Sequence, residues 1–335
     1  MKLQKQKSFY KEIFELTIHH FNKSKIYRKI LNNFNFNKNK KYSIERLPFI
    51  PVRFFKHIDL KSIEDKDVFK ILKSSGTSGQ QSKIFLNTQN AIKQRIVLKE
   101  LFERYVNKER LPMFILGQNP KNNGYSYDAK TAAILGFSMF GKNHQYFIDE
   151  NNEENIESFL SQIKLKNKVL MFGFTSEVYS FFSKTLKNYK KKIDLSNVTL
   201  LHGGGWKKLE ETKISNYEFK KNLRTNFNIK KIINYYGLVE QIGSIFFECP
   251  KCNLFICSKY SDIIIRDKDF NVLTNKKGMV QLLSLLPTSY PGHNILTEDI
   301  GEVVSNVNCE KKHKEKMFRI FGRIEKSEIR GCSNV

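Results

Sequence analysis

The feature that most constrains this chain is an alternation of short apolar runs with helical or polar stretches through its middle. The apolar runs that read as strands cover residues 113–117, 145–149, 169–174, 198–205 and 231–237. Strands that alternate with helices indicate βαβ units, because parallel neighbours need a crossover of about a dozen residues or more. We therefore expect an α/β protein with a largely parallel, βαβ-rich sheet.

The two ends of the chain depart from this pattern. Apolar residues at loosely helical spacing over 8–31 predict an opening amphipathic helix, and a second long helix is expected over about 91–105. After Glu248 the apolar runs are short, β-like and separated by turns. We therefore expect two domains, one over 1–248 and a β-rich one over 249–335.

Composition excludes several classes of protein. With 40% hydrophobic and 27% charged residues, the 335-residue chain is globular rather than disordered or fibrous. It contains no run that approaches the roughly 18 apolar residues of a membrane helix. Its basic N-terminus lacks the apolar core of a signal peptide, and five cysteines are too few for a disulfide scaffold. We expect a cytoplasmic protein with no membrane span.

The formal net charge of +25 suits a nucleic acid or an anionic surface as partner. The excess is mostly Lys, however, and comes with abundant Asn, Ile and Phe along the whole chain, as AT-rich coding would produce. The Lys-dense runs 187–194 and 310–319 contain few aromatic residues and no regular base-stacking pattern. We interpret them as solvated surface and expect no specific nucleic-acid partner, with a basic nucleic-acid or surface-binding protein as the alternative class.

The segment KSSGTSGQQSK (73–83) combines glycines and hydroxyl residues directly after a predicted strand. Glycines let backbone amides approach a phosphate, and hydroxyl groups add donors around it. The spacing is not that of a Walker A loop. A flexible Ser/Gly turn is the structural alternative.

Three further segments carry candidate binding residues. VTLLHGGGWKK (198–208) ends in three glycines, where ligands of open α/β sheets bind. NYYGLVEQIG (234–243) offers an aromatic ring for a purine and Glu240 for a metal. LTEDIGEV (296–303) is followed by Gly322 and Arg323, and this acid and guanidinium suit ribose and phosphate oxygens. Taken singly, these segments also fit glycine turns, acidic turns and surface arginines.

In this order the segments resemble those of adenylate-forming enzymes. Within that superfamily the chain is most similar to the acyl-protein synthetases, the fatty-acid activating subunit of the bacterial bioluminescence fatty-acid reductase. The resemblance covers nearly the whole chain, and the matching strings are LPFIPVRFFK (47–56), SSGTSGQQSKI (74–84), LHGGGWK (201–207), YYGLVEQ (235–241), SYPGHNILTEDIGEV (289–303) and GRIEKSEIRGC (322–332).

The resemblance implies a two-step reaction that uses ATP and Mg²⁺. A carboxylic acid, in this family a fatty acid, attacks the α-phosphate to give an acyl-adenylate and pyrophosphate, and a thiol then attacks the acyl carbon. Residues 1–248 would bind nucleotide and acid, while 249–335 would complete the AMP site and end in a mobile tail. An acyl-reductase or a carrier protein is the implied partner.

The resemblance also assigns roles to individual residues. Glu240 would bind Mg²⁺, and Asp299 with Arg323 would hold the ribose. The residues that it places around the phosphates are Ser74, Ser75, Gly76, Thr77, Ser78, Gly79 and Lys83. Those that it places around the adenine are Gly203, Gly204, Gly205, Tyr236 and Gly237.

The chain departs from the superfamily pattern in two places. Two glutamines and a serine precede Lys83, whereas the usual loop lysine follows the second glycine closely. The sequence also ends three residues after Cys332, where the usual mobile C-terminal domain would begin, so most of that domain and its adenylation lysine are expected to be missing. We predict that Lys207 takes over the role of that missing lysine.

The cysteines suggest two further roles. In the resembled family a cysteine near the C-terminus accepts the acyl group, and Cys332, beside Arg330, is the matching residue. Cys249 and Cys252 with Cys309 and His313 have the spacing C-x2-C and C-x3-H of a structural zinc site. Cys257 is a competing ligand, and ordinary reduced thiols are the alternative.

A second enzymatic interpretation stays open at this point. An aryl or amino acid could be the substrate, with coenzyme A or a carrier protein as the acceptor in place of Cys332. The nature of the acceptor thiol separates the two interpretations.

Overall fold

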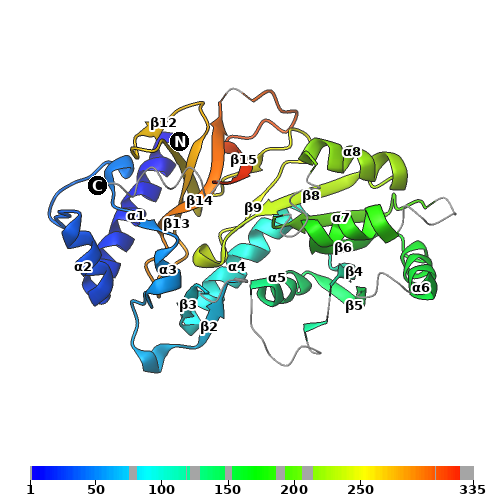
Figure 1. Cartoon of the computed structure of the whole chain (residues 1–335), viewed down its shortest axis with the longest axis horizontal. Helices are drawn as coiled ribbons and strands as arrows, with labels where there is room; N and C mark the ends of the chain where they lie inside the picture. The colour runs from blue at the N-terminus through cyan, green and yellow to red at the C-terminus, as the bar shows by residue number, and fades with distance from the viewer. Residues whose placement is uncertain are drawn as a thin grey trace. The chain divides into compact units, whose positions relative to one another are not determined.

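The computed structural model describes residues 2–74, 81–117, 119–120, 129–147, 153–185, 193–205, 214–305 and 307–324 (Figure 1). In these ranges the helices and helical turns are α1 (Lys2–Lys23), α2 (Lys25–Asn33), η1 (Ile44–Arg46), α3 (Phe54–His57), η2 (Asp65–Asp67), α4 (Thr88–Tyr105), α5 (Ala129–Ser138), α6 (Glu153–Lys164), α7 (Thr175–Ser180), η4 (Phe181–Thr185), α8 (Asn216–Phe227) and η6 (Val239–Gln241). The strands are β1 (Ile50–Pro51), β2 (Lys70–Lys73), β3 (Lys83–Leu86), β4 (Leu111–Leu116), β5 (Gly141–Phe147), β6 (Val169–Phe174), β7 (Val198–Gly203), β8 (Lys231–Tyr236), β9 (Phe246–Phe247), β10 (Phe255–Ile256), β11 (Ser261–Arg266), β12 (Val272–Leu273), β13 (Gly278–Ser284), β14 (Asn294–Val304) and β15 (Met317–Arg323).

The chain forms two compact units, and neither is continuous in sequence. The first unit combines residues 1–98 and 237–246 with 254–335, and the second combines 99–236 with 247–253. The N-terminal residues therefore pack with the C-terminal strands. The sequence predicts a domain boundary between residues 248 and 249, and this boundary stays a prediction.

The second unit contains the parallel sheet that the apolar runs predicted. Its strands lie in the order β5-β4-β6-β7-β8-β9, and neighbours from β5 to β8 pair in parallel. The chain passes from β4 to β5 on one side and then to β6 on the other, so the strand order reverses between β4 and β6. In open α/β sheets, ligands bind at the carboxyl ends of the strands beside such a reversal.

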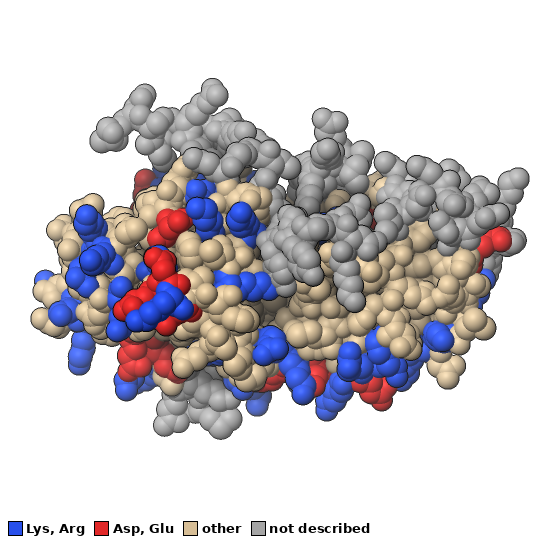
Figure 2. All heavy atoms as spheres, turned by 90° about the horizontal axis from the view of Figure 1, so that it is seen from below, with Lys and Arg blue, Asp and Glu red and all other residues tan. Residues whose placement is uncertain are grey.

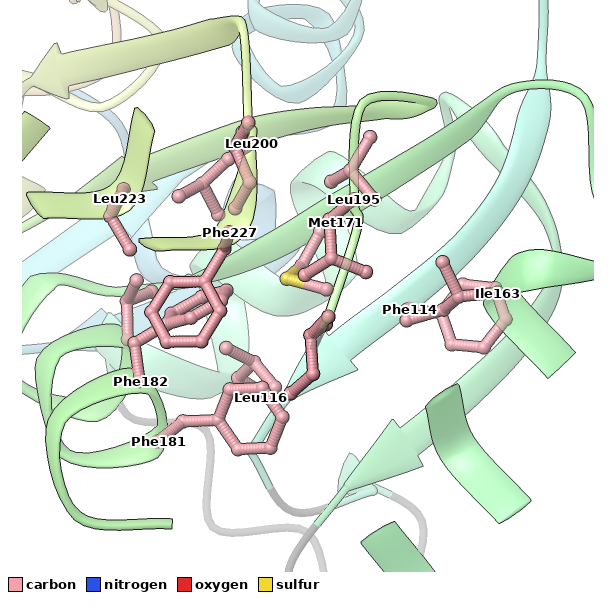
Figure 3. Close-up of a cluster of buried hydrophobic side chains, with 14 of the residues drawn as sticks. Phe114, Leu116, Ile163, Met171, Phe181, Phe182, Leu195, Leu200, Leu223 and Phe227 are labelled. Carbon is pink, nitrogen blue, oxygen red and sulfur yellow. The ribbon is translucent and has the colours of Figure 1, made fainter. Parts of the chain in front are cut away.

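The core of the second unit lies between this sheet and helices that cover it (Figure 3). Every residue of β6 is buried, because helices cover both faces of a parallel sheet and leave no polar face. Helix α8 contributes Phe219, Leu223 and Phe227 to the same cluster. This helix begins at Asn216, because Ser215 and Glu218 form a capping box that starts it.

The first unit contains the β-rich last third of the chain. Strands β10-β15-β14-β13-β11-β12 form an antiparallel sheet, and the short strand β1 joins it beside β14, with Ile50 opposite Ile295. The β2 and β3 strands form a separate hairpin. The acidic segment 296–303 is part of the long strand β14 rather than a turn.

The predicted opening helix is interrupted at Ser24. Its side chain accepts a hydrogen bond from the backbone of Tyr27 and caps α2, so the single helix expected over 8–31 is two helices. Two buried histidines connect α1 to the rest of the first unit. His20 of α1 has its Nδ1 2.8 Å from Ser62 Oγ, and His293 has its Nε2 2.9 Å from Oγ1 of Thr17 in α1. The rings of His20 and His293 stack, with centroids 4.9 Å apart.

The surface carries basic and acidic side chains together. On the face shown in Figure 2, Lys and Arg are scattered, with acidic side chains among them and uncharged surface between them. This distribution agrees with the interpretation of the lysines as solvated surface. No helix in the described part of the chain is both long enough and apolar enough to span a membrane.

Candidate active site

The loop predicted to bind phosphate is closed at its base by two serines. Ser74 N donates to the carbonyl oxygen of Ser82 at 3.0 Å, and Ser82 N donates to Ser74 Oγ at 2.9 Å. Lys83 begins β3, and its ammonium pairs with Asp59 at 3.3 Å in an exposed position, where an ion pair contributes little to stability. The remaining predicted loop residues, Ser75, Gly76, Thr77, Ser78 and Gly79, lie outside the described residues.

Glu240 lies in η6 and is buried. Burial raises the pKa of Glu240, while the neighbouring Ser82 and, more weakly, Arg323 and Lys56 act to lower it. Within the described part of the chain, the Glu240 carboxylate forms no ion pair, and Arg323 and Lys56 act on it only through longer-range electrostatics. Its position beside Ser82 brings the predicted metal ligand to the foot of the predicted phosphate loop.

The segment around Glu240 is fixed by its neighbour Gln241. The Gln241 amide donates to the carbonyl oxygens of Leu282 and Gly292, at 3.1 and 2.9 Å. A Cβ on Gly292 would lie 2.5 Å from the carbonyl oxygen of Glu240, so only glycine permits this approach. Gly292 belongs to the string SYPGHNILTEDIGEV and Glu240 to YYGLVEQ, so the fold brings these two strings together.

Asp299 and Arg323 lie opposite each other on β14 and β15. Arg323 Nε is 3.8 Å from Asp299 Oδ1, and the Asp299 backbone amide donates to Thr297 Oγ1 at 3.1 Å. The Asp299 side chain is 11% exposed and that of Arg323 is 76% exposed. The acid is therefore fixed while the guanidinium reaches solvent, an arrangement that suits a polar ligand such as ribose.

The three glycines at the end of β7 in the second unit have different surroundings. A Cβ on Gly203 would lie 2.4 Å from the Tyr235 ring, and Gly204 has a φ of +78°. Among the described residues, none has an atom within 4 Å of a Cβ on Gly205. Two of the glycines, Gly203 and Gly204, are therefore needed by the fold.

The two aromatic residues at the end of β8, Tyr235 and Tyr236, differ in burial. Tyr235 is buried and stacks on Phe172, so it belongs to the core. Tyr236, the residue predicted to border adenine, is half-buried, as is Gly237. The exposed part of this strand end is therefore the part that the sequence assigned to the nucleotide.

Polar side chains that the sequence did not single out also lie at these strand ends. Glu177, on α7, lies close to Gly117 after β4 and forms an ion pair with Lys130. This position is where the strand order reverses. The sequence signal was Thr-Ser-Glu directly after the apolar run 169–174, a carboxylate at the start of a helix after a strand.

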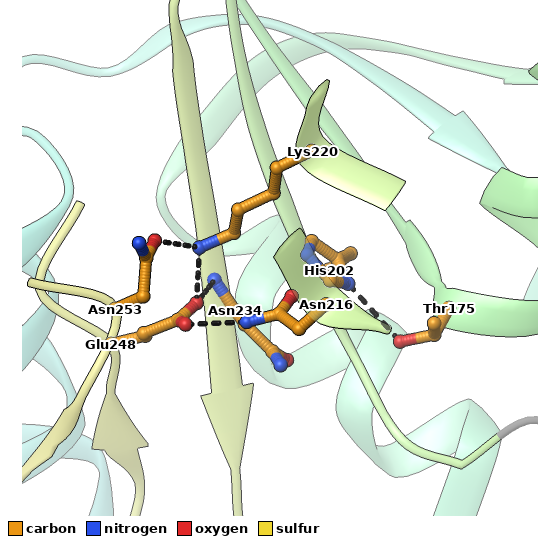
Figure 4. Close-up of polar contacts among 7 residues, drawn as sticks. All are labelled: Thr175, His202, Asn216, Lys220, Asn234, Glu248 and Asn253. Carbon is orange, nitrogen blue, oxygen red and sulfur yellow. Dashed lines mark hydrogen bonds and ion pairs between the residues drawn. The ribbon is translucent and has the colours of Figure 1, made fainter. Parts of the chain in front are cut away.

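His202, beside the glycines, is a structural residue. Its Nδ1 lies 3.1 Å from Thr175 Oγ1 (Figure 4), and burial, followed by the charge of Lys220, lowers its pKa to about 3. The ring is therefore neutral at ordinary pH and links the ends of β6 and β7.

Two predicted catalytic residues, Lys207 and Cys332, lie outside the described residues. The four predicted zinc ligands are described. Cys249 and Cys252 lie in the second unit, whereas Cys309, His313 and the competing ligand Cys257 lie in the first, and zinc binding stays a prediction.

Comparison with known proteins tests the assignment. The family described as acyl-protein synthetase, LuxE, matches residues 2–335. The chain belongs to the acyl-protein synthetase family. A relative of this synthetase, the long-chain-fatty-acid–luciferin-component ligase of Aliivibrio fischeri, is 22% identical over 329 residues, which cover 94% of the chain and 84% of the relative.

Solved structures confirm the expected fold of the synthetase. A 2-hydroxyisobutyryl-CoA ligase, in complex with 2-HIB-AMP and CoA, matches 96% of the chain and 70% of its own length, with a TM-score of 0.72 and 12% identity. ATP-bound MatB from Rhodopseudomonas palustris matches 78% of the chain and 49% of its own length, with a TM-score of 0.52 and 12% identity. The fold is therefore that of the adenylate-forming ligases.

Proposed function

We propose that this synthetase uses ATP to convert a fatty acid to an acyl-adenylate and then transfers the acyl group to a protein thiol. The observation that carries the proposal is the buried Glu240 carboxylate, which lies beside Ser82 at the foot of the Ser/Gly/Thr loop. In the same unit, Asp299 and Arg323 form a polar pair on adjacent strands. The A. fischeri relative, named for a long-chain fatty acid, supports the substrate class.

The first step needs charge stabilisation more than covalent help from the protein. A carboxylate oxygen of the acid attacks the α-phosphorus, the bond to the bridging oxygen breaks, and pyrophosphate leaves. Both reactants are anionic, so positioned donors and cations are the effective catalysts. Amides and hydroxyls of residues 74–79, with Lys83, would hold the β- and γ-phosphates. Gly203–Gly205, Tyr236 and Gly237 would border the adenine, and Asp299 with Arg323 would hold the ribose.

Glu240 fits the role of Mg²⁺ ligand. Mg²⁺ prefers carboxylate and phosphate oxygens, and a buried carboxylate that forms no ion pair within the described residues gains most from a nearby divalent cation. Bound Mg²⁺ would neutralise charge between neighbouring phosphate oxygens. Lys207 follows the glycines of the adenine side in sequence, and we propose it as the cation that acts during adenylation.

In the second step a thiolate attacks the acyl carbon and AMP leaves. We propose Cys332 as this nucleophile, because it occupies the family position near the C-terminus and Arg330 favours the thiolate. The thioester would then pass to a reductase or a carrier protein. We propose a cytoplasmic location, in keeping with reduced thiols.

ATP–pyrophosphate exchange that depends on added acid tests the first step. Long-chain fatty acids should support exchange, and aryl and amino acids should not. Glu240→Gln should lower the exchange rate at least about a hundredfold, since a charge-stabilising group is lost. Asp299→Asn should lower it about tenfold or more, the effect of one charged hydrogen bond.

The matched control is Glu302→Gln, which changes an acid on the same strand as Asp299 but outside the proposed site. This variant should exchange like the wild type. Undiminished exchange in Glu240→Gln would contradict the assigned metal ligand, and exchange with aryl acids alone would contradict the substrate class.

Covalent labelling tests the acceptor. With labelled fatty acid and ATP, the wild type should carry a hydroxylamine-sensitive label, whereas Cys332→Ser should carry none and still catalyse exchange. Ser333→Ala, at the next position, should label like the wild type. A label that persists in Cys332→Ser would assign the acceptor role to another thiol.

A further inference from the structure

We infer that a groove beside helix α4 binds the alkyl chain of a fatty acid, with the carboxylate of that acid paired to Lys93. The groove has a volume of about 440 Å³, within the range of small-ligand sites. Its lining residues all lie in the first unit: Gln89, Ile92, Lys93, Ile96, Val97 and Tyr260. This inference goes beyond the proposed function, since neither adenylation nor acyl transfer has been assigned any of these residues.

Helix α4 buries two polar side chains and exposes two isoleucines. Asn90 and Gln94, one turn apart, are buried, and Gln94 packs beside Gly243. Ile92 and Ile96, also one turn apart, are 41% and 61% exposed. A surface helix normally turns its apolar residues to the core and its polar residues to water. The exposed isoleucines therefore indicate a face that binds a ligand.

This face of α4 points away from the segment that carries Glu240. With 3.6 residues per turn, Ile92 lies about 160° around the helix from Asn90 and from Gln94. Gln94 contacts Gly243, three residues after Glu240 in the sequence. The groove is therefore a site apart from the proposed metal ligand, on the opposite side of the helix.

Lys93 gives the groove a cation. Its Nζ donates to the carbonyl oxygen of Leu285 at 2.7 Å, and it forms no ion pair within the described residues. Partial burial lowers the pKa of Lys93, while the charge of Glu12, on α1, acts to raise it from farther away. A ligand carboxylate beside this ammonium would form a charge-assisted hydrogen bond.

An apolar wall with one cation suits an amphiphile with one anionic end. The lining follows α4 from Gln89 to Val97, about 12 Å at the rise of a helix, so an extended chain fits it. Tyr260 lines the groove from the turn between β10 and β11, and the Lys259 ammonium lies 4.8 Å from its ring centroid. An alkyl chain would cover the isoleucines, and its carboxylate would meet Lys93.

Photoaffinity labelling of the full-length protein, without ATP, tests the site. Myristic acid that carries a diazirine in its chain should label residues 89–97 or Tyr260, and excess myristic acid should prevent this labelling. Myristyl alcohol, which lacks the carboxylate, should compete about tenfold less well, the effect of one charged hydrogen bond. Labelling that is absent from both segments, or that myristic acid does not reduce, would overturn the inference.

Two variants test the two parts of the groove. Ile96→Glu should lose the labelling, because it places a carboxylate on the apolar wall at an exposed position that folding tolerates. In Lys93→Gln, myristic acid should compete about tenfold less well. The matched controls are Leu165→Glu, at a residue 78% exposed elsewhere, and Arg95→Gln, at an exposed position of α4 outside the lining. Both controls should label like the wild type, and unchanged labelling in Ile96→Glu would refute the site.

Sedimentation tests two other occupants of an apolar face. A dimer that Ile96→Glu dissociates would make the groove an interface between two copies of the chain, and binding to phosphatidylglycerol vesicles that Ile96→Glu abolishes would make it a membrane contact. Either result would overturn the inference. The labelling needs neither ATP nor turnover, so failure of this site is distinguishable from failure of the proposed ligase activity.

Discussion

Buried histidines give this protein a pH dependence that can be traced to individual rings. His20 and His293 are fully buried in the first unit. Burial lowers the pKa of His293 to about 3, and the charge of His19 acts in the same direction. Burial, followed by the charges of His293 and His19, places the pKa of His20 well below its ordinary value. Both rings are therefore neutral in the folded protein.

The free energy of unfolding should fall as the pH is lowered from about 6.5 toward 3. In this range an unfolded histidine binds a proton that the folded His293 excludes, so the unfolded state gains protons and the stability present above pH 6.5 is lost. Each histidine contributes at most about 1.4 kcal/mol per pH unit. Urea unfolding of the wild type at several pH values measures this slope.

His293→Gln should flatten the slope, because one excluded proton is removed from the balance. His57→Gln, which changes an exposed histidine, should leave the slope unchanged. Equal slopes in the wild type and in His293→Gln would mean that the pKa of His293 is the same in the folded and unfolded states.

At the same scale, ordered strings in the sequence point to candidate site residues, whereas pairs that only the fold brings together are missed. Glu240, Asp299 and Arg323 stand in recognisable motifs, and their assignment to the site stays a prediction. Glu177 and Lys130 are 47 positions apart, and their ion pair depends on two helices beside the same sheet. Such pairing cannot be read from one sequence, since side-chain proximity is set by the crossover connections.

Among the elements, α8 and the turn after β9 are joined by a buried ion pair. Lys220 and Glu248 are each 1% exposed, and their charged atoms lie 2.6 Å apart. Burial lowers the pKa of Lys220, while the charge and hydrogen bond of Glu248 act to raise it. Asn216 and Asn253 complete the hydrogen bonding of the pair (Figure 4).

Lys220→Met should lower the free energy of unfolding by about 3–5 kcal/mol, because it leaves the Glu248 carboxylate buried without its cation. The double variant Lys220→Met with Glu248→Gln should recover part of this loss, since no buried charge remains. Lys221→Met, at the next and exposed position of α8, serves as the control. Denaturant unfolding checks all three variants, and an unaltered Lys220→Met would refute the buried-pair account.

Strand and helix positions were predicted best where burial is complete. Strand β6 coincides with the apolar run 169–174, because both of its faces are covered. Strand β14 was only partly predicted, because Thr297, Glu298 and Asp299 interrupt its apolar pattern. Asp299 belongs to the proposed site, and functional residues are where local sequence rules fail most often.

At the scale of the whole molecule, the charge of +25 carries little information about function. Lys and Arg lie among acidic side chains on the face shown in Figure 2, and the family match over residues 2–335 was reached without any use of charge. The order of the motifs along the sequence was the informative feature, because each motif reports a local backbone that a ligand requires.

The discontinuous first unit has a consequence for the chain as it leaves the ribosome. Residues 1–98 emerge first, yet their partners in that unit lie in 254–335; β1, for example, pairs with β14. Contacts between segments so far apart in sequence form late, and apolar surface stays exposed until they do. The opening helices therefore lack these partners until residues 254–335 have been synthesised, and Ser82, Glu240 and Asp299 come together only after that.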